Sequence, residues 1–280
     1  MSRVWLITGA SRGFGRCLTE AVLDAGDSVL ATARRPEQLD DLVARYGTRI
    51  RPVALDVTDP EAAVRAVKEA ATGFGRLDVV VNNAGYANSA AIEEVAEDDF
   101  RRQIETNLFG VVNVTRAALP LFRAQRSGTF VQFSSIGGRV GGTPGMGAYQ
   151  TAKFAVEGFS EVLASETAPF GVKVIIVEPG AFRTDWQGAS MTRHAVGPDY
   201  EETVGAIHRY RDAHDGNQPG DPARGAKAVI DVVGAEQPPR RLILGGDAVE
   251  AARKAAEERA AETEQWAEVS RSADFPRTER

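Results

Sequence analysis

Seven short apolar runs, rich in β-branched residues, recur along this chain, and longer amphipathic stretches separate them. The runs are nearly continuous in apolar character and mostly bounded by Gly, Asp or Asn. This pattern is typical of strands that are buried on both faces of a parallel sheet. We therefore expect strands at 3–8, 28–33, 50–55, 77–82, 128–134, 172–177 and 241–244.

Helical patterns occupy the intervals between these runs. Repeated alternation of strand and helix predicts a parallel sheet with right-handed crossovers and helices on both faces. No linker or internal repeat divides the 280 residues, so we expect one α/β domain over residues 1–246, a doubly wound parallel sheet of about seven strands. The helices are expected at 13–25, 37–46, 59–74, 97–125, 148–169 and 221–235.

Two segments depart from this rhythm. Residues 185–220 hold Pro198, Pro219 and several glycines, with a helical piece near 199–213. The segment is longer than an ordinary connection, which favours a substrate lid or loop. The tail, 247–280, is rich in Ala and Glu and predicts a solvated surface helix over 247–269, with Trp266 as one residue that anchors it.

The composition excludes several kinds of protein. A net charge of −6 argues against a nucleic-acid partner. One cysteine, Cys17, and three histidines without an H-E-x-x-H arrangement predict no metal site. No apolar run approaches the ~20 residues that a membrane span needs, and the apolar start VWLI is too short for a signal peptide. We expect a cytoplasmic protein that acts on a small molecule, with no nucleic acid or membrane partner.

The sequence TGASRGFG, residues 8–15, follows the first strand and opens the first helix. Its glycines at 9, 13 and 15 permit a tight turn and a close approach of the backbone to a ligand. The N-terminus of the helix offers unpaired N–H groups and the positive end of the helix dipole to a pyrophosphate. Because ligands bind at the carboxyl ends of strands in such sheets, the turn predicts a nucleotide site.

Further motifs follow in a fixed order. They are LDV at 55–57, NNAG at 82–85, Asn107 in ETNLFG, Tyr149 and Lys153 in Y-x-x-x-K, and EPG at 178–180 followed by Thr184. With the T-G-x-x-x-G-x-G turn, they make the chain resemble the short-chain dehydrogenase/reductase family from residue 3 to about 185. The resemblance implies a Rossmann fold and hydride transfer between a nicotinamide cofactor and a carbonyl or secondary alcohol. It also implies a homodimer or homotetramer formed through the helices at 97–125 and 148–169.

The end of the second strand indicates which cofactor is used. NAD-binding folds usually place an acidic residue about 20 residues past the glycines, but Ala33 stands there and Arg34 and Arg35 follow. A guanidinium binds a 2′-phosphate that a carboxylate would repel, and Arg12 approaches the same phosphate from the glycine turn. We therefore expect NADP(H), although Arg34 and Arg35 have an alternative role as solvated residues. The resemblance assigns the cofactor to Gly9, Ser11, Arg12, Gly13, Phe14, Gly15, Arg34, Arg35, Asp56, Val57, Asn83, Ala84, Gly85, Tyr149, Lys153, Pro179, Gly180 and Thr184.

Tyr149 and Lys153 stand four residues apart, so on a helix they share a face. A phenol with an ordinary pKa of ~10 is a poor acid, and a nearby ammonium favours its ionised form. The resemblance makes Tyr149 the acid/base and gives Lys153 a second role on the nicotinamide ribose. It makes Asn107 the ligand of a relay water, with a buried polar group bonded to backbone as the alternative. Thr184 is expected at the nicotinamide carboxamide, or else as a turn cap.

The serine that polarises the substrate carbonyl has two candidates. Ser135 precedes Tyr149 by one position more than the family's usual spacing, and Ser134 lies farther still. The glycine-rich loop 137–145 can absorb one additional residue without moving its ends. Because strand side chains alternate, Ser134 would point to the opposite side. We assign the role to Ser135.

An NADP(H)-dependent carbonyl reductase or alcohol dehydrogenase is the leading hypothesis. A non-catalytic NADP(H)-sensing protein would not need Ser135, Tyr149 and Lys153 together. An epimerase or dehydratase with tightly bound NAD would need an acidic end of the second strand. We expect an apolar ketone, aldehyde or secondary alcohol as the substrate, because no cluster of Arg or Lys in 185–220 requires a phosphorylated or acyl-carrier substrate. Trp186, Met191, Tyr200 and Tyr210 would form an apolar wall, and His194 and His208 would face solvent.

Overall fold

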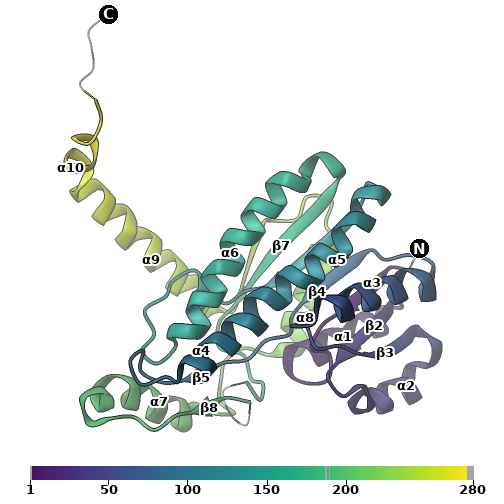
Figure 1. Cartoon of the computed structure of the whole chain (residues 1–280), viewed down its shortest axis with the longest axis horizontal. Coiled ribbons are helices and arrows are strands. Elements are labelled where there is room, and N and C mark those ends of the chain that lie inside the picture. Colours follow the sequence, from purple (N-terminus) through teal and green to yellow (C-terminus); the bar gives the residue numbers. More distant parts are fainter. Residues whose placement is uncertain (1, 187, 189, 276–280) are drawn as a thin grey trace, which may run out of the picture.

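The computed structural model describes residues 2–186, 188 and 190–275. At its centre, a parallel sheet of seven strands runs in the order β3-β2-β1-β4-β6-β7-β9, with helices on both faces (Figure 1). The predicted doubly wound α/β fold of the Rossmann type is confirmed, and each of the seven apolar runs forms one strand. The strands are β1 (Val4–Ile7), β2 (Ser28–Ala33), β3 (Ile50–Ala54), β4 (Val79–Asn82), β6 (Gly128–Phe133), β7 (Val172–Pro179) and β9 (Arg241–Leu244).

The sheet separates two hydrophobic cores. In β1, Trp5 and Ile7 lie in one core and Leu6 lies in the other, because alternate side chains of a strand point to opposite faces. The first core is covered by α1 (Gly13–Asp24), α2 (Asp40–Tyr46) and α8 (Pro222–Gly234). The second is covered by α3 (Pro60–Phe74), α5 (Gly110–Gln125) and α6 (Gly147–Thr167). Short 3₁₀ turns lie at Pro36–Leu39, Gly47–Arg49, Ile136–Gly138 and Ala168–Phe170.

The order of the strands determines where a ligand can bind. From β1 the chain runs outward to β2 and β3, then returns to β4 on the other side of β1. In such sheets the crevice lies outside the carboxyl ends of the strands at this point of reversal. The carboxyl ends of β1, β4, β6 and β7 therefore bring the glycine turn, NNAG, the serines and the segment from 178 to one edge of the sheet.

The predicted helix at 97–125 is divided into α4 (Glu97–Ile104), a π-helical turn (Glu105–Phe109) and α5. In the turn, the N–H of Gly110 donates to the carbonyl of Glu105, five residues back. Gly110 packs so closely on Val57 that a Cβ would lie 2.5 Å from Val57 Cγ2. The π turn was not predicted, because one additional residue leaves the helical periodicity on either side unchanged.

Segment 185–220 lies beside the loop that follows β4. Strand β8 (Thr192–Arg193) pairs in parallel with β5 (Asn88–Ser89), and Figure 1 shows α7 (Ala206–His214) next to β8 at one end of the molecule. A 3₁₀ turn (Pro198–Tyr200) and a π turn (Glu201–Gly205) lead into α7, so the predicted helical piece is present. The small sheet was not predicted, because strands of two residues carry no periodic signal.

The C-terminal helices α9 (Gly246–Gln265) and α10 (Ala267–Arg271) project away from the sheet (Figure 1). The start of α9 is anchored by the buried side chains of Ala248 and Ala252, and Arg259 donates to the carbonyl of Val140 at 3.0 Å. The predicted surface helix is present, but Trp266 is 55% exposed and does not anchor it. Within the described residues, no helix is both long enough and apolar enough to cross a bilayer.

Candidate active site

The glycine turn is held by hydrogen bonds to the end of β4. The hydroxyl of Thr8 accepts from the backbone N–H groups of Asn83 and Ala84, each at 3.0 Å, and Asn83 Nδ2 donates to the carbonyl of Thr8 at 2.9 Å. Gly9 has φ of +66°, and a Cβ there would lie 2.9 Å from Ala84 Cα. A Cβ on Gly15 would lie 2.3 Å from the carbonyl oxygen of Gly9. These glycines are therefore required by the packing of the turn itself.

At the N-terminus of α1, no side chain of the helix start caps the backbone N–H groups. Arg12 occupies the N-cap position without a capping side-chain hydrogen bond, and the first turn contains no acidic residue. The first N–H groups of a helix have no partner within the helix, so they and the helix dipole suit a pyrophosphate. The ring of Phe14 packs edge-on against Phe133 and Phe182, with centroids 5.0 and 5.3 Å away. The side chain of Phe14 therefore packs against the core, and only its backbone is available to a ligand.

The end of β2 presents two exposed arginines, Arg34 and Arg35, and among the described residues neither forms an ion pair. Arg12 Nε lies 3.9 Å from Asp185, in an exposed contact. The exposed guanidinium groups of Arg34 and Arg35 fit a phosphate on the adenosine ribose. Asp56 binds its own neighbour Thr58, through backbone and side chain at 3.0 and 2.8 Å, and remains exposed.

Tyr149 and Lys153 lie in the first two turns of α6, next to the carboxyl end of β6. Both are buried: Tyr149 is 8% exposed and Lys153 is 5% exposed. Lys153 Nζ lies 5.7 Å from the centroid of the Tyr149 ring and donates to the carbonyl of Phe133 at 2.7 Å. Burial lowers the pKa of Lys153 to about 8. The predicted pair therefore shares one face of the helix.

The pKa of Tyr149 differs from the sequence expectation. Burial raises it to about 12, while a hydrogen bond with the Ser135 hydroxyl and the charge of Arg211 lower it in part. The ammonium of Lys153 lies 5.7 Å from the centroid of the phenol ring and donates its hydrogen bond to the Phe133 carbonyl. Burial destabilises the ionised form of the phenol more than the contacts with Ser135 and Arg211 stabilise it, so the pKa of Tyr149 is raised.

The two serines have different surroundings. Ser135 lies beside Tyr149, and its hydroxyl also accepts from the N–H of Gly137 at 3.0 Å. Ser134 is buried against α6, where its hydroxyl lies 3.5 Å from the carbonyl of Lys153. The glycine-rich loop takes up the additional residue with positive φ at Gly141, Gly142 and Gly145. Ser135, as predicted, is the serine next to the phenol.

Asn107 lies in the π turn and is completely buried. Its Oδ1 accepts from the N–H of Tyr86 at 3.0 Å, and its Nδ2 donates to the carbonyls of Tyr86 and Gln103, each at 2.8 Å. A Cβ on Gly85 would lie 2.5 Å from Asn107 Oδ1 and 3.7 Å from Lys153 Nζ, so the asparagine is close to the lysine. These bonds match the alternative of a buried polar group that binds backbone, and the water relay stays a prediction.

The loop after β7 is held by a residue that the sequence analysis missed. Asp247, at the start of α9, accepts from the N–H of Ala181 at 2.8 Å, and a Cβ on Gly180 would lie 2.5 Å from its Oδ2. Thr184 Oγ1 accepts from the N–H of Trp186 at 3.3 Å, as a turn cap does. Asp247 follows two glycines in an otherwise ordinary tail, so only its contact with the loop reveals its role.

Segment 185–220 supplies side chains to the site, with two differences from the prediction. The ring of Trp186 lies 5.2 Å from that of Tyr149, and buried Met191 belongs to the same apolar cluster. Tyr200 and Tyr210, however, are not part of the wall: Tyr200 lies beside the carboxylates of Glu93 and Glu94, and Tyr210 is 60% exposed and stacks on His214.

The two histidines of this segment do not face solvent as predicted. His194 Nε2 lies 3.2 Å from Asp99 Oδ2, and His208 Nε2 lies 2.8 Å from the Ser89 hydroxyl. Both are half-buried, because the pairing of β8 with β5 draws the segment onto the loop that follows β4.

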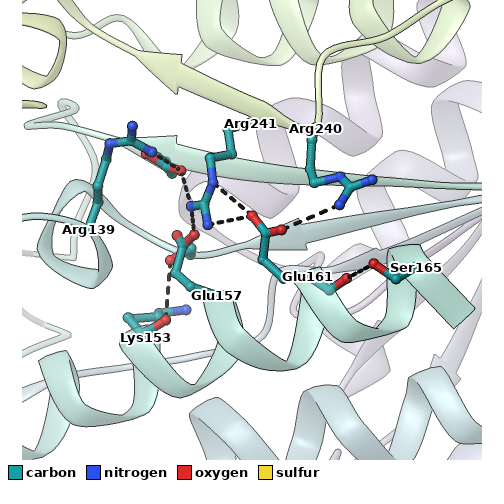
Figure 2. A network of polar contacts seen from close by, with 9 residues as sticks. Arg139, Lys153, Glu157, Glu161, Ser165, Arg240 and Arg241 are labelled. Carbon is teal, nitrogen blue, oxygen red and sulfur yellow. Dashed lines mark hydrogen bonds and ion pairs between the residues drawn. The ribbon is translucent and has the colours of Figure 1, made fainter. Parts of the chain in front are cut away.

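Behind the site, Arg241 of β9 lies among three carboxylates (Figure 2). It pairs with Glu157 and Glu161 of α6 and with Glu178 of β7. Glu178 is completely buried, and burial raises its pKa although Arg139 also pairs with it. The network fixes α6 to the strand that precedes the Pro179–Gly180 loop.

Known proteins resemble this chain over nearly its whole length. The short chain dehydrogenase family model matches residues 3–194. Oxidoreductase BOA17 of Botryotinia fuckeliana (strain B05.10) is 52% identical over 271 residues, which cover 96% of this chain and 98% of that protein. A short-chain dehydrogenase from Streptomyces avermitilis has a TM-score of 0.92 at 44% identity, covering 98% of this chain and 100% of that one.

A further solved structure contains a nucleotide. The short chain dehydrogenase from Burkholderia cenocepacia J2315 in complex with NADP has a TM-score of 0.74 at 27% identity, covering 94% of this chain and 97% of that one. The family model extends over the glycine turn, NNAG and the Tyr149–Lys153 pair of α6. This chain therefore belongs to the short-chain dehydrogenase family of oxidoreductases.

Proposed function

We propose that this protein is an NADP(H)-dependent carbonyl reductase that converts a small ketone or aldehyde to an alcohol. The observation that carries the proposal is the group formed by Ser135, Tyr149 and Lys153. The Tyr149 phenol is hydrogen-bonded to Ser135, and Lys153 Nζ lies 5.7 Å from the phenol ring and donates to the carbonyl of Phe133, the last residue of β6. Such an arrangement suits proton transfer to an oxygen that gains negative charge.

NADPH would supply the hydride. The open N–H groups of α1 suit its pyrophosphate. The exposed guanidinium groups of Arg34 and Arg35, with that of Arg12, which is weakly paired with Asp185, suit its 2′-phosphate. The loop of Pro179 and Gly180, with Thr184, would hold the nicotinamide end. The related Burkholderia enzyme, whose structure contains NADP, supports the same cofactor here.

Tyr149 would donate the proton. A phenol with a pKa of about 12 is neutral near pH 7 and so holds the proton to be donated, although a pKa this high makes it a weak acid. Ser135, hydrogen-bonded to that phenol, would donate to the substrate carbonyl. Lys153, with a pKa of about 8, keeps most of its charge at pH 7, where it would bind the ribose and favour the tyrosinate as the proton leaves.

Oxidation of NADPH by the purified protein, measured over a panel of ketones and aldehydes, tests this proposal. We expect turnover with NADPH to exceed turnover with NADH. The alternative is a sensor on the same fold, which would bind NADPH tightly and reduce no substrate. Nucleotide binding without turnover over the whole panel would favour the sensor.

We also propose a homodimer or homotetramer built through α4, α5 and α6. Phe109, at the end of the π turn between α4 and α5, is 46% exposed, and Phe154, on α6, is 42% exposed. A groove of about 610 Å³ adjoins Phe109 and is lined largely by apolar side chains, among them Ile92, Val95, Phe100 and Ile104. Exposed apolar patches of this kind often mark contacts with another protein. The cytoplasmic location stays a prediction.

A further inference from the structure

Arg211 is a buried cation without a carboxylate partner. It lies in α7 and is 8% exposed. Its one hydrogen-bond contact within the described residues runs from Nη1 to the sulfur of Met191, at 3.6 Å, and a thioether is a weak acceptor. A buried guanidinium ordinarily pairs with an acid, because taking a charge out of water is costly. This one forms no ion pair with any residue that the structure describes.

The position of Arg211 relates it to the reacting groups. Met191, which it contacts, belongs to the same buried cluster as Tyr149 and Trp186. The charge of Arg211 acts on the phenol of Tyr149 and favours its ionised form. The guanidinium therefore stands on the lid side of the catalytic phenol, within an apolar wall.

The charged groups around Arg211 leave its charge uncompensated. Arg193 acts on Arg211 as a like charge and is itself paired with Asp212. His208 binds Ser89, and the charges of Arg193 and Arg211 help to lower its pKa. Although the whole chain has a net charge of −6, this part of the site is positive.

We propose that Arg211 binds a carboxylate of the substrate, so that the substrate is an oxo acid with an apolar chain between its two functional groups. The inference rests on the proposed carbonyl reduction and names its substrate class. One uncompensated guanidinium matches one negative charge, and its planar donors fit a carboxylate bidentately. Trp186 and Met191 would contact the apolar part, and the carbonyl would lie at Tyr149 and Ser135.

This assignment changes the substrate expected from the sequence. No cluster of Arg or Lys in 185–220 requires a phosphorylated or acyl-carrier substrate, so the sequence favours an apolar one. A single cation, however, is enough for a monoanion when it is buried, because a charge-assisted hydrogen bond is stronger away from water. The apolar wall that the sequence predicted is retained beside it.

The test compares levulinate, and its longer straight-chain homologues, with their methyl esters. Each pair shares the same ketone and differs in one negative charge. The kcat/KM ratio of acid to ester is measured with NADPH for the unchanged protein, Arg211→Met and Arg211→Lys. Arg209→Met is the matched control, since Arg209 lies on the same helix but is exposed and paired with Glu201.

We expect Arg211→Met to lower the acid-to-ester ratio by about 10- to 100-fold, mainly through the KM of the acid, as removal of a hydrogen bond to a charged group does. Arg211→Lys should restore part of the ratio, and Arg209→Met should leave it unchanged. An unchanged ratio in Arg211→Met would overturn the inference. The inference would also be overturned if Arg211→Met lowered kcat/KM equally for acid and ester and shifted the pH profile of both by the same amount. Arg211 would then act only through the pKa of Tyr149.

A binding experiment separates this inference from the proposed reaction. Hexanoate and hexanamide contain no ketone, so calorimetric titration of each reports anion binding without turnover. We expect hexanoate to bind the unchanged protein more tightly than hexanamide, and Arg211→Met to remove that preference. If no ketone is reduced but the preference is present, the proposed function fails and the anion site stands. If ketones are reduced and the preference is absent, the anion site fails alone.

Discussion

The ammonium of Lys153 donates to the carbonyl oxygen of Phe133 over 2.7 Å. Phe133 is the last residue of β6, and Ser135 follows two residues later. The bond therefore holds the strand end that carries the serine against the helix that carries Tyr149. Burial, and not a charged partner, lowers the pKa of Lys153 to about 8. Folding therefore places the ammonium in surroundings that disfavour its charge, which lowers the stability of the folded protein wherever the lysine is protonated.

That cost predicts a pH dependence of stability. The pKa of a lysine is ordinarily 10.5 and that of Lys153 in the fold is about 8, so between these pH values the unfolded chain holds a proton that the folded chain has released. The free energy of unfolding should rise with pH across this window, by an amount on the order of 3 kcal/mol. Urea unfolding at both ends of the window should show this rise in the unchanged protein but not in Lys153→Met. Lys227→Met, at an exposed ion pair with Asp231, should behave like the unchanged protein; equal slopes in all three would contradict the prediction.

Removal of the Tyr149 hydroxyl should abolish most of the reaction. We expect Tyr149→Phe to reduce kcat for ketone reduction by about 10²- to 10⁴-fold, because the proton donor is lost while the ring stays against Trp186. Nucleotide binding and circular dichroism should change little. Tyr210→Phe is the control, since Tyr210 is exposed on the lid. Reduction that survives in Tyr149→Phe would show that another group supplies the proton.

Arg34 should distinguish the two nicotinamide cofactors. In Arg34→Ala we expect the KM for NADPH to rise by about 10- to 100-fold, through loss of a charge-assisted hydrogen bond, and the KM for NADH to stay nearly constant. Steady-state kinetics with both nucleotides measure this difference. Arg45→Ala removes an arginine of α2 that pairs with Asp24, and should affect neither nucleotide. Equal losses for both nucleotides in Arg34→Ala would refute contact with a 2′-phosphate.

The Arg241 network should contribute strongly to stability. Arg241→Met would leave Glu157 and Glu178 buried with one cation fewer, and breaking a buried pair in this way costs about 3–5 kcal/mol. Addition of Glu157→Gln should recover part of the loss, because it removes one of the uncompensated charges. Urea unfolding measures the free energy of unfolding of both variants. Arg253→Met, at an exposed cluster on α9, is the control. If Arg241→Met lowered the free energy of unfolding no more than this control does, the network would not be stabilising.

Association through α4, α5 and α6 predicts which surface changes produce monomers. Phe109→Asp and Phe154→Asp should each lower the molar mass measured by light scattering, since a charge would be buried in an apolar contact. Val64→Asp, at an exposed valine of α3, should leave the assembly unchanged. A mass that stays the same in both phenylalanine variants would exclude this surface as the interface.

The sequence alone determined the sheet and the positions of its strand ends. A strand buried on both faces must be apolar along its length, so the five inner strands carry a local signal, whereas the edge strands β3 and β9 are only partly buried. The glycine turn is partly a local matter, since Gly9 has a positive φ and a Cβ on Gly15 would meet the carbonyl oxygen of Gly9, although the close contact of Gly9 with Ala84 comes from the fold. The choice of Ser135 followed from the alternation of side chains along a strand.

Tertiary structure decided what depends on partners far apart in the chain. The pKa of Tyr149 is set by burial under the segment of Trp186, the bond of Lys153 reaches back to Phe133, and Asp247 supports a loop some sixty residues earlier. Arg211 looks like any other arginine of a polar helix until the fold buries it without a carboxylate. Burial and charge pairing are sums over neighbours that the fold brings together, and no local pattern in the sequence contains them.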